Sequence, residues 1–170
     1  MNAYYYLIAS LPYLVFNQVS TMSKDAFLGE CKKWLSFHDL NALFLAGLDI
    51  KEETEIGPLV LKKWTTFNRE FRERIGKMRS QRKENFTGNR GESAEDIFQG
   101  KDPLIMEMKF EKKRWDFIEE TAALHCFDIN YLVAYFLKLQ INERIKQFDK
   151  DMGQNFFKKL CEDNYEQAKR

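Results

Sequence analysis

The chain has 170 residues, in which 27 lysines and arginines nearly balance 26 aspartates and glutamates, for a formal net charge of +1. This near-neutral charge argues against general nucleic-acid binding, so any basic binding site has to be local. The length fits one domain with a real core, which 15 phenylalanines, seven tyrosines and three tryptophans make rich in aromatic side chains.

The cysteines and the N-terminal segment predict where the protein resides. Cys31, Cys126 and Cys161 are odd in number and form no C-x-x-C pair, which suits a reducing compartment. Residues 1–16 are apolar but lack the basic flank and cleavage site of a signal peptide, and Pro12 interrupts a stretch too short to span a bilayer. We expect a cytoplasmic protein, peripheral at most on the cytoplasmic face of a membrane.

The first segment, residues 4–15, can be read in two ways. Its apolar residues follow a 3.6-residue stripe that favours a helix. Three consecutive tyrosines also favour a strand, and Pro12 would break or kink a helix. Helix and strand both remain open for residues 3–16, and burial in the core is expected in either case.

Two further apolar stripes predict short helices. One runs from Phe27 to Leu35 and the other from Leu40 to Leu48. The candidate N-terminal boundaries are Thr21 or Ser23 for the former and Ser36 or His38 for the latter.

The clearest helical pattern follows Gly57-Pro58. Its apolar residues recur every three or four positions and predict one long amphipathic helix. They are Val60, Trp64, Phe67, Phe71, Ile75 and Met78. The polar face of this helix is unusually basic and carries Arg69, Arg72, Arg74, Lys77, Arg79, Arg82 and Lys83.

The second half predicts a linker and three helices. Residues 85–102 contain three glycines among polar residues, and Asp102-Pro103 then predicts a helix start. A helix from Leu104 toward His125 would bury Trp115, Ile118 and Ala122 beside Phe117, Thr121 and Leu124. Asp128 would cap a helix from Ile129 to Phe148, and a last helix would bring together Met152, Phe156, Phe157, Leu160 and Cys161 before fraying over 162–170.

These elements predict an all-α protein, a compact bundle of roughly seven helices. A single helical domain over residues 1–170 is the simplest organisation. Two sub-bodies, 1–84 and 103–170, joined by the Gly-containing linker 85–102, are the alternative.

The one cluster with catalytic residue types is His125-Cys126-Phe127-Asp128. Because it lies between two predicted helices, we interpret Asp128 as an N-cap beside two small buried side chains. Carboxylate pairs such as Glu119-Glu120 lie on segments expected to be solvated, and no phosphate loop, zinc motif or nucleophile elbow occurs. We therefore predict a protein that is not an enzyme and has no cofactor, metal or small-molecule substrate.

The basic helix face from Arg69 to Lys83 is the one patch with binding potential. Arginine forks suit carboxylates and phosphates, so acidic protein surfaces, anionic lipid and RNA are all candidate partners. A solvated face that shields the apolar stripe beneath it is an equally weighted alternative.

Motifs at both ends of the chain carry a family resemblance. They are the opening Tyr4-Tyr5-Tyr6-Leu7-Ile8-Ala9-Ser10-Leu11-Pro12, the element Arg114-Trp115-Asp116-Phe117, and the run Leu137-Lys138-Leu139-Gln140-Ile141-Asn142-Glu143-Arg144. Together they resemble a bacterial family of unknown function whose members are typically encoded among the subunits of a V-type (A/V-type) ATPase. That family is similar in style to the C/d subunit of those ATPases, which is all-helical and non-catalytic and holds the foot of the central rotor shaft on the membrane ring.

The resemblance implies a non-catalytic helical subunit, or an accessory or assembly protein, of a V-type ATPase. Its partners would be other subunits of the central stalk or membrane ring, and membrane contact would be indirect. Because the C/d subunit is about twice as long, this chain alone would supply only part of a site that holds the rotor shaft. The resemblance then implies a second copy of this chain, another subunit or a different role. The alternative is a small RNA-binding module that uses the basic face. The candidate partner-binding residues are Arg69, Arg72, Arg79, Arg82, Lys83, Arg114, Asp116, Lys138, Gln140, Glu143 and Arg144.

Overall fold

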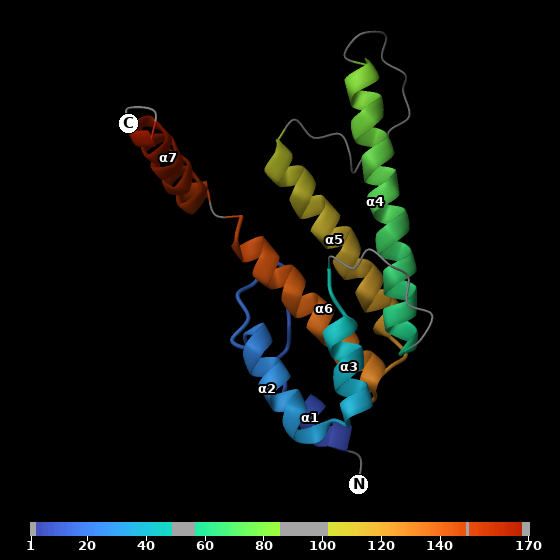
Figure 1. The fold of residues 1–170 in the computed structure, drawn as a ribbon. Helices are drawn as coiled ribbons and strands as arrows, with labels where there is room; N and C mark the ends of the chain where they lie inside the picture. The colour runs from blue at the N-terminus through green and yellow to red at the C-terminus, as the bar shows by residue number, and fades with distance from the viewer. Residues whose placement is uncertain (1–2, 49–56, 86–101, 149, 168–170) are drawn as a thin grey trace.

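The computed structural model describes residues 3–48, 57–85, 102–148 and 150–167, with side chains left undescribed at 3, 81–85, 150–152 and 163–167. Within these ranges the chain forms seven helices and no strand, which confirms the all-α prediction (Figure 1). The helices are α1 (Ala3–Ser10), α2 (Lys24–Trp34), α3 (Phe37–Leu45), α4 (Leu59–Asn85), α5 (Pro103–Ala122), α6 (Ile129–Lys146) and α7 (Lys150–Gln167). The linker predicted between α4 and α5 falls almost wholly outside the described residues.

Helix α6 forms the centre of the bundle. It packs against α2, α3, α4 and α5, and every residue from Leu132 to Leu137 is buried. A helix that is apolar on all sides is stable only when other elements surround it. This explains the nearly uncharged first half of α6, which Figure 1 shows running through the middle of the bundle.

Polar side chains of α6 bind the backbone of segments that lie far away in the sequence. Gln140 forms hydrogen bonds with the backbone of the segment that follows α3, and Asn142 with the backbone of the segment that follows α1. Buried backbone groups without a partner are costly, so these amides stabilise two irregular segments against the central helix. The bonds run from Gln140 Nε2 to Ala46 O (2.9 Å), Leu48 N to Gln140 Oε1 (3.3 Å), Asn142 Nδ2 to Val15 O (3.0 Å) and Asn17 N to Asn142 Oδ1 (3.1 Å).

The helix starts follow the predicted capping residues. Each cap accepts a hydrogen bond from a backbone N–H of the first turn, which otherwise has no partner inside the helix. Ser23 accepts from Ala26 N, Ser36 from Asp39 N, Asp102 from Leu104 N ahead of Pro103, and Asp128 from Tyr131 N. Ser23 and Ser36 are thus the correct choices of the two pairs of candidates.

The first segment is a helix, but a shorter one than its apolar stripe indicates. It ends at Ser10, two residues before Pro12, because the residue that precedes a proline is biased away from helical angles. Leu7 and Ile8 are buried, whereas Tyr5 and Tyr6 are exposed. Burial in the core is therefore confirmed for one face of α1 and wrong for the other.

Other predicted boundaries are too long at their C-terminal ends. The predicted helix 40–48 is α3, which ends at Leu45, and the predicted helix 129–148 is α6, which ends at Lys146. Leu124 was expected in the core, but it is 94% exposed because α5 ends at Ala122 and the chain turns away. Hydrophobic periodicity alone does not indicate the residue at which a helix ends.

Helix α7 extends away from the bundle in Figure 1. It carries the predicted apolar stripe, yet Phe156, Phe157 and Leu160 are exposed. Among the described residues, no helix is both long enough and apolar enough to cross a membrane.

Candidate functional site

A buried ion pair within α5, Glu111 with Arg114, is the core of a polar network that Arg144 of α6 joins. Glu111 lies on the same face of α5 as Trp115 and Ile118, so the packing of that face places it inside the bundle. Glu111 is 0% exposed and Arg114 is 5% exposed. Glu111 Oε1 accepts from Arg114 Nη1 at 2.6 Å, and Arg144 Nε of α6 lies 3.2 Å from the same oxygen.

Burial opposes the charges of this pair. It raises the pKa of Glu111, while the positive charges of Arg114 and Arg144 act in the opposite direction. Burial also lowers the pKa of Arg114, against the attraction of Glu111. Glu111 Oε2 and Arg114 Nε are buried and have no hydrogen-bond partner among the described residues. Each group therefore depends on the other to remain charged.

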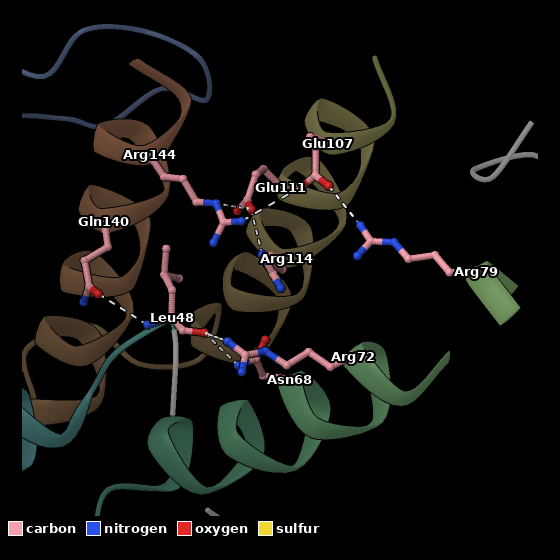
Figure 2. A network of polar contacts seen from close by, with 9 residues as sticks. All are labelled: Leu48, Asn68, Arg72, Arg79, Glu107, Glu111, Arg114, Gln140 and Arg144. Carbon is pink, nitrogen blue, oxygen red and sulfur yellow. Dashed lines mark hydrogen bonds and ion pairs between the residues drawn. The ribbon is translucent and has the colours of Figure 1, made fainter. Parts of the chain in front are cut away.

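The network continues to α4 through two further acceptors. Glu107 Oε1 accepts from Arg79 Nη2 at 3.2 Å, and its Oε2 lies 4.0 Å from Arg144 Nη2. The second acceptor is the carbonyl of Leu48, in the segment after α3, which accepts from Arg72 Nη2 at 2.8 Å and from Asn68 Nδ2 at 2.9 Å. Figure 2 shows arginines from α4, α5 and α6 reaching into the space between the three helices.

Four of the predicted partner-binding residues thus lie at one site. Arg72, Arg79, Arg114 and Arg144 line a pocket of ≈ 410 Å³ between α4, α5 and α6, together with Glu107. Arg72 and Arg79 share α4, whereas Arg114 comes from α5 and Arg144 from α6, so the three helices bring them together only through packing. Other predicted residues lie elsewhere: Arg69 is exposed on α4, and the side chains of Arg82 and Lys83 lie outside the described residues.

The remaining predicted residues make local or internal contacts. Lys138 Nζ pairs with Glu119 at 2.9 Å and lies 4.9 Å from the centre of the Trp115 ring. Asp116 pairs with Lys112, one turn away on the exposed face of α5. Glu143 Oε1 accepts from Lys24 N at the start of α2, at 2.8 Å, and Gln140 holds the backbone after α3, as described above. Lys138, Gln140 and Glu143 thus connect α6 to other segments of the bundle, whereas the contact of Asp116 stays within α5.

Sequence reasoning missed the acidic members of the network, Glu107 and Glu111. One signal for Glu111 was available, since it precedes Trp115 and Ile118 by four and seven residues on the apolar stripe of α5. Glu119 was interpreted as solvated, and it is exposed. Burial acts to raise the pKa of Glu119, but its bonds to Lys138 and Trp115 outweigh burial and hold the pKa below the ordinary value. A lowered pKa does not suit a general acid.

The cluster at residues 125–128 has a structural explanation. His125 Nδ1 lies 2.7 Å from Asp128 Oδ2, and Asp128 Oδ1 caps α6 by accepting from Tyr131 N at 3.0 Å. The expectation that Cys126 is buried is wrong, because it is exposed in the turn between α5 and α6. In the described part of the chain, no three His, Cys, Asp or Glu residues are placed to hold a metal ion.

Replacement of Asp128 by alanine is expected to lower the free energy of unfolding at neutral pH by about 1–2 kcal/mol, because α6 loses its N-cap. Burial would raise the pKa of Asp128, but bonds from Asn130, the Tyr131 N–H and His125 outweigh it and hold the pKa below 3.8. The stabilisation is thus present above pH 3.8 and is lost as the pH falls through the folded-state pKa. Urea unfolding at several pH values measures this difference, and Asp128→Asn is the control that keeps the cap. A difference that grows on acidification would contradict the prediction.

A second surface feature is a strip of aromatic side chains formed by Tyr5, Tyr6, Trp34 and Phe127, here called the aromatic strip. Their exposed fractions are 54%, 55%, 47% and 48%. Ring centroids are 5.0 Å apart for Tyr5 and Phe127, 5.8 Å for Tyr5 and Tyr6, and 6.4 Å for Tyr6 and Trp34. Contiguous exposed aromatic surface is typical of protein–protein contacts.

The fold and these sites define a helical bundle protein, with an ion-paired network between α4, α5 and α6 and an exposed aromatic strip. A family model described as "Protein of unknown function (DUF2764)" matches residues 77–166, which is more than half of the chain. The chain belongs to this family. The matched region contains Arg79, Glu111, Arg114 and Arg144 of the network. No curated protein and no solved structure matched the chain.

Proposed function

We propose that this protein is a non-catalytic helical subunit, or an accessory or assembly protein, of a V-type ATPase, and that it acts by docking on other subunits. The aromatic strip carries the docking part of this proposal. Tyrosine and tryptophan supply most of the binding energy in many interfaces, because they bury large areas with few rotatable bonds. The assignment to a V-type ATPase rests on the resemblance of the terminal motifs.

The internal contacts support a rigid body rather than a mobile one. Gln140, Asn142 and Glu143 of α6 fasten the segments around α1, α2 and α3, and the ion pair at Glu111 joins α5 to α6. A protein in a rotor or stalk transmits force through its packing, and torque through a soft coupling is lost to deformation. The internal motif residues would therefore hold the shape, while the aromatic strip would contact the partner.

Co-purification from the native host tests this function. The full chain would carry a C-terminal tag, which leaves α1 unmodified, and captured proteins would be identified by mass spectrometry. We expect subunits of a V-type ATPase with the wild-type chain, and at least a tenfold smaller yield with Tyr6→Ala/Trp34→Ala, because two anchors at about 2 kcal/mol each are lost. Tyr13→Ala, an exposed tyrosine outside the strip, is the matched control and should leave the yield unchanged.

Three results would argue against the proposal. Capture of no ATPase subunit would remove the assignment, and equal yields from the strip and control variants would remove the aromatic strip as the docking surface. Salt-sensitive capture of RNA in place of ATPase subunits would favour the alternative, in which exposed basic residues of α4 such as Arg74 and Lys77 bind phosphates.

A further inference from the structure

One end of the bundle brings together the starts of α1, α3, α4 and α6. Tyr4 Oη donates to Asp39 Oδ2 at 2.7 Å, which joins the start of α1 to the start of α3. Val60 N donates to Asn130 Oδ1 at 3.1 Å, which joins the start of α4 to the start of α6. The ring contacts of the aromatic strip connect these two pairs. Figure 1 shows this end at the bottom of the bundle, where the α2–α3 and α5–α6 turns also lie.

Two large apolar side chains project from these turns. Phe37 begins α3 and is 88% exposed, and Leu124 follows α5 and is 94% exposed. They flank the aromatic strip, because Phe37 comes three residues after Trp34 and Leu124 three residues before Phe127. The hot spots of protein interfaces lie in closely packed pockets, whereas Phe and Leu side chains that project from turns suit insertion into the fluid interface of a bilayer.

The charges at this end favour an anionic surface. Lys32 in the last turn of α2, and Lys62 and Lys63 in the first turn of α4, are exposed and form no ion pair with another described residue. Of the exposed carboxylates described nearby, Glu120 alone has no such pair. The other carboxylates at this end are bonded within the protein: Asp39 to Tyr4, Asp128 to the Tyr131 N–H, Glu30 to Lys33 and Glu119 to Lys138. The lysines without ion pairs thus outnumber Glu120.

We propose that this end of the bundle binds the surface of a lipid bilayer that contains anionic lipid. Phe37 and Leu124 enter the boundary between headgroups and acyl chains, and the aromatic strip lies at headgroup level, where tyrosine and tryptophan are favoured. The three lysines lie near the lipid phosphates, whose attraction acts over about one Debye length. This contact is direct, in contrast to the indirect one that the family resemblance implies. A subunit docked beside the strip would then lie at the membrane surface.

Co-sedimentation of the full chain with vesicles tests this proposal. We expect saturable binding to phosphatidylcholine vesicles that contain phosphatidylglycerol, and weaker binding to pure phosphatidylcholine or at high salt. Phe37→Ala/Leu124→Ala should bind the anionic vesicles at least about tenfold more weakly, because it removes the inserted apolar area. Lys62→Gln/Lys63→Gln should reduce the preference for anionic over neutral vesicles. These side chains are exposed, so the variants should fold normally.

The matched control removes exposed apolar side chains from other parts of the surface. Val19 is 75% exposed in a segment bound to Asn142 and Glu143, toward the far end of α6, and Phe157 is 66% exposed on α7. Val19→Ala/Phe157→Ala should bind the anionic vesicles within about twofold of wild type. This control also tests α7 as a rival membrane-binding surface.

Tryptophan emission reports which end of the bundle meets the lipid. Trp34 is 47% exposed at the proposed surface, whereas Trp64 and Trp115 are 0% and 3% exposed. Lipids brominated close to the headgroup quench only nearby tryptophans, so they should reduce the emission of the bound wild-type chain. Trp34→Phe should still bind the vesicles but should lose this quenching.

Three results would overturn the proposal. They are the absence of binding to anionic vesicles by the folded wild type, equal weakening in the two apolar double variants, and binding without quenching of Trp34. In the first case, Phe37 and Leu124 would be left for a protein partner. The proposal goes beyond the ATPase assignment and does not depend on it. Because the vesicles contain no protein, vesicle binding and docking on ATPase subunits can fail separately.

Discussion

Replacement of Glu111 by alanine is expected to lower the free energy of unfolding by about 3–5 kcal/mol, because it leaves Arg114 buried without a counter-ion. Glu111 is 0% exposed, and its Oε1 receives Arg114 at 2.6 Å and Arg144 at 3.2 Å. Urea unfolding followed by circular dichroism measures the loss. Glu107→Ala is the matched control on the same helix. Because Glu107 is partly solvated, its removal should cost about 1 kcal/mol or less.

A double variant separates the buried charge from other effects of truncation. Glu111→Leu/Arg114→Leu removes both charges and fills much of their volume, so it should recover most of the stability lost in Glu111→Ala. If the double variant is no more stable than Glu111→Ala, the loss does not come from an uncompensated charge, and this explanation of the ion pair is wrong.

Replacement of Phe27 by alanine is expected to have an effect of similar size, about 3–5 kcal/mol, through a cavity in the aromatic core. Phe27 is 0% exposed, and its ring centroid lies 5.2 Å from that of Tyr135 and 5.6 Å from that of Phe136. Both partners lie on α6, so the variant loosens α2 from the central helix. Thermal and urea unfolding of the full chain measure the change.

The control for this prediction is Phe37→Ala. Phe37 is 88% exposed, so the same chemical change should alter the free energy of unfolding by about 0.5 kcal/mol or less. Comparable losses at the two positions would show that Phe27 does not occupy the core position described.

The architecture could be predicted from the sequence wherever it depends on local patterns. The stripe from Val60 to Met78 and the uncharged start of α6 indicate helices because helical periodicity is a property of neighbouring residues. Asp102 and Asp128 mark helix starts for the same reason, since capping involves residues only two or three positions apart. The C-terminal ends were less predictable, because tertiary packing decides how far the last turn continues.

The polar network could not be predicted in the same way. Arg72, Arg114 and Arg144 are separated by dozens of residues, and only the packing of α4, α5 and α6 brings them together. Sequence analysis selected these arginines as partner-binding residues but did not detect Glu111, which contacts two of them, Arg114 and Arg144.

The aromatic strip could not be predicted from the sequence for a different reason. Tyr5 and Tyr6 adjoin Leu7 and Ile8 in one apolar run, and hydropathy alone does not separate the exposed face of α1 from the buried one. Both residues therefore looked like core side chains in the sequence.

The central claim, that this protein docks on a V-type ATPase through the aromatic strip, is tested most directly with purified components. The chain would be titrated against the ATPase isolated from the native host, with binding followed by interferometry. We predict saturable binding that Tyr6→Ala/Trp34→Ala weakens at least tenfold and that Tyr13→Ala leaves unchanged. Absence of binding by a folded wild-type chain, or equal affinities for all three proteins, would contradict the claim.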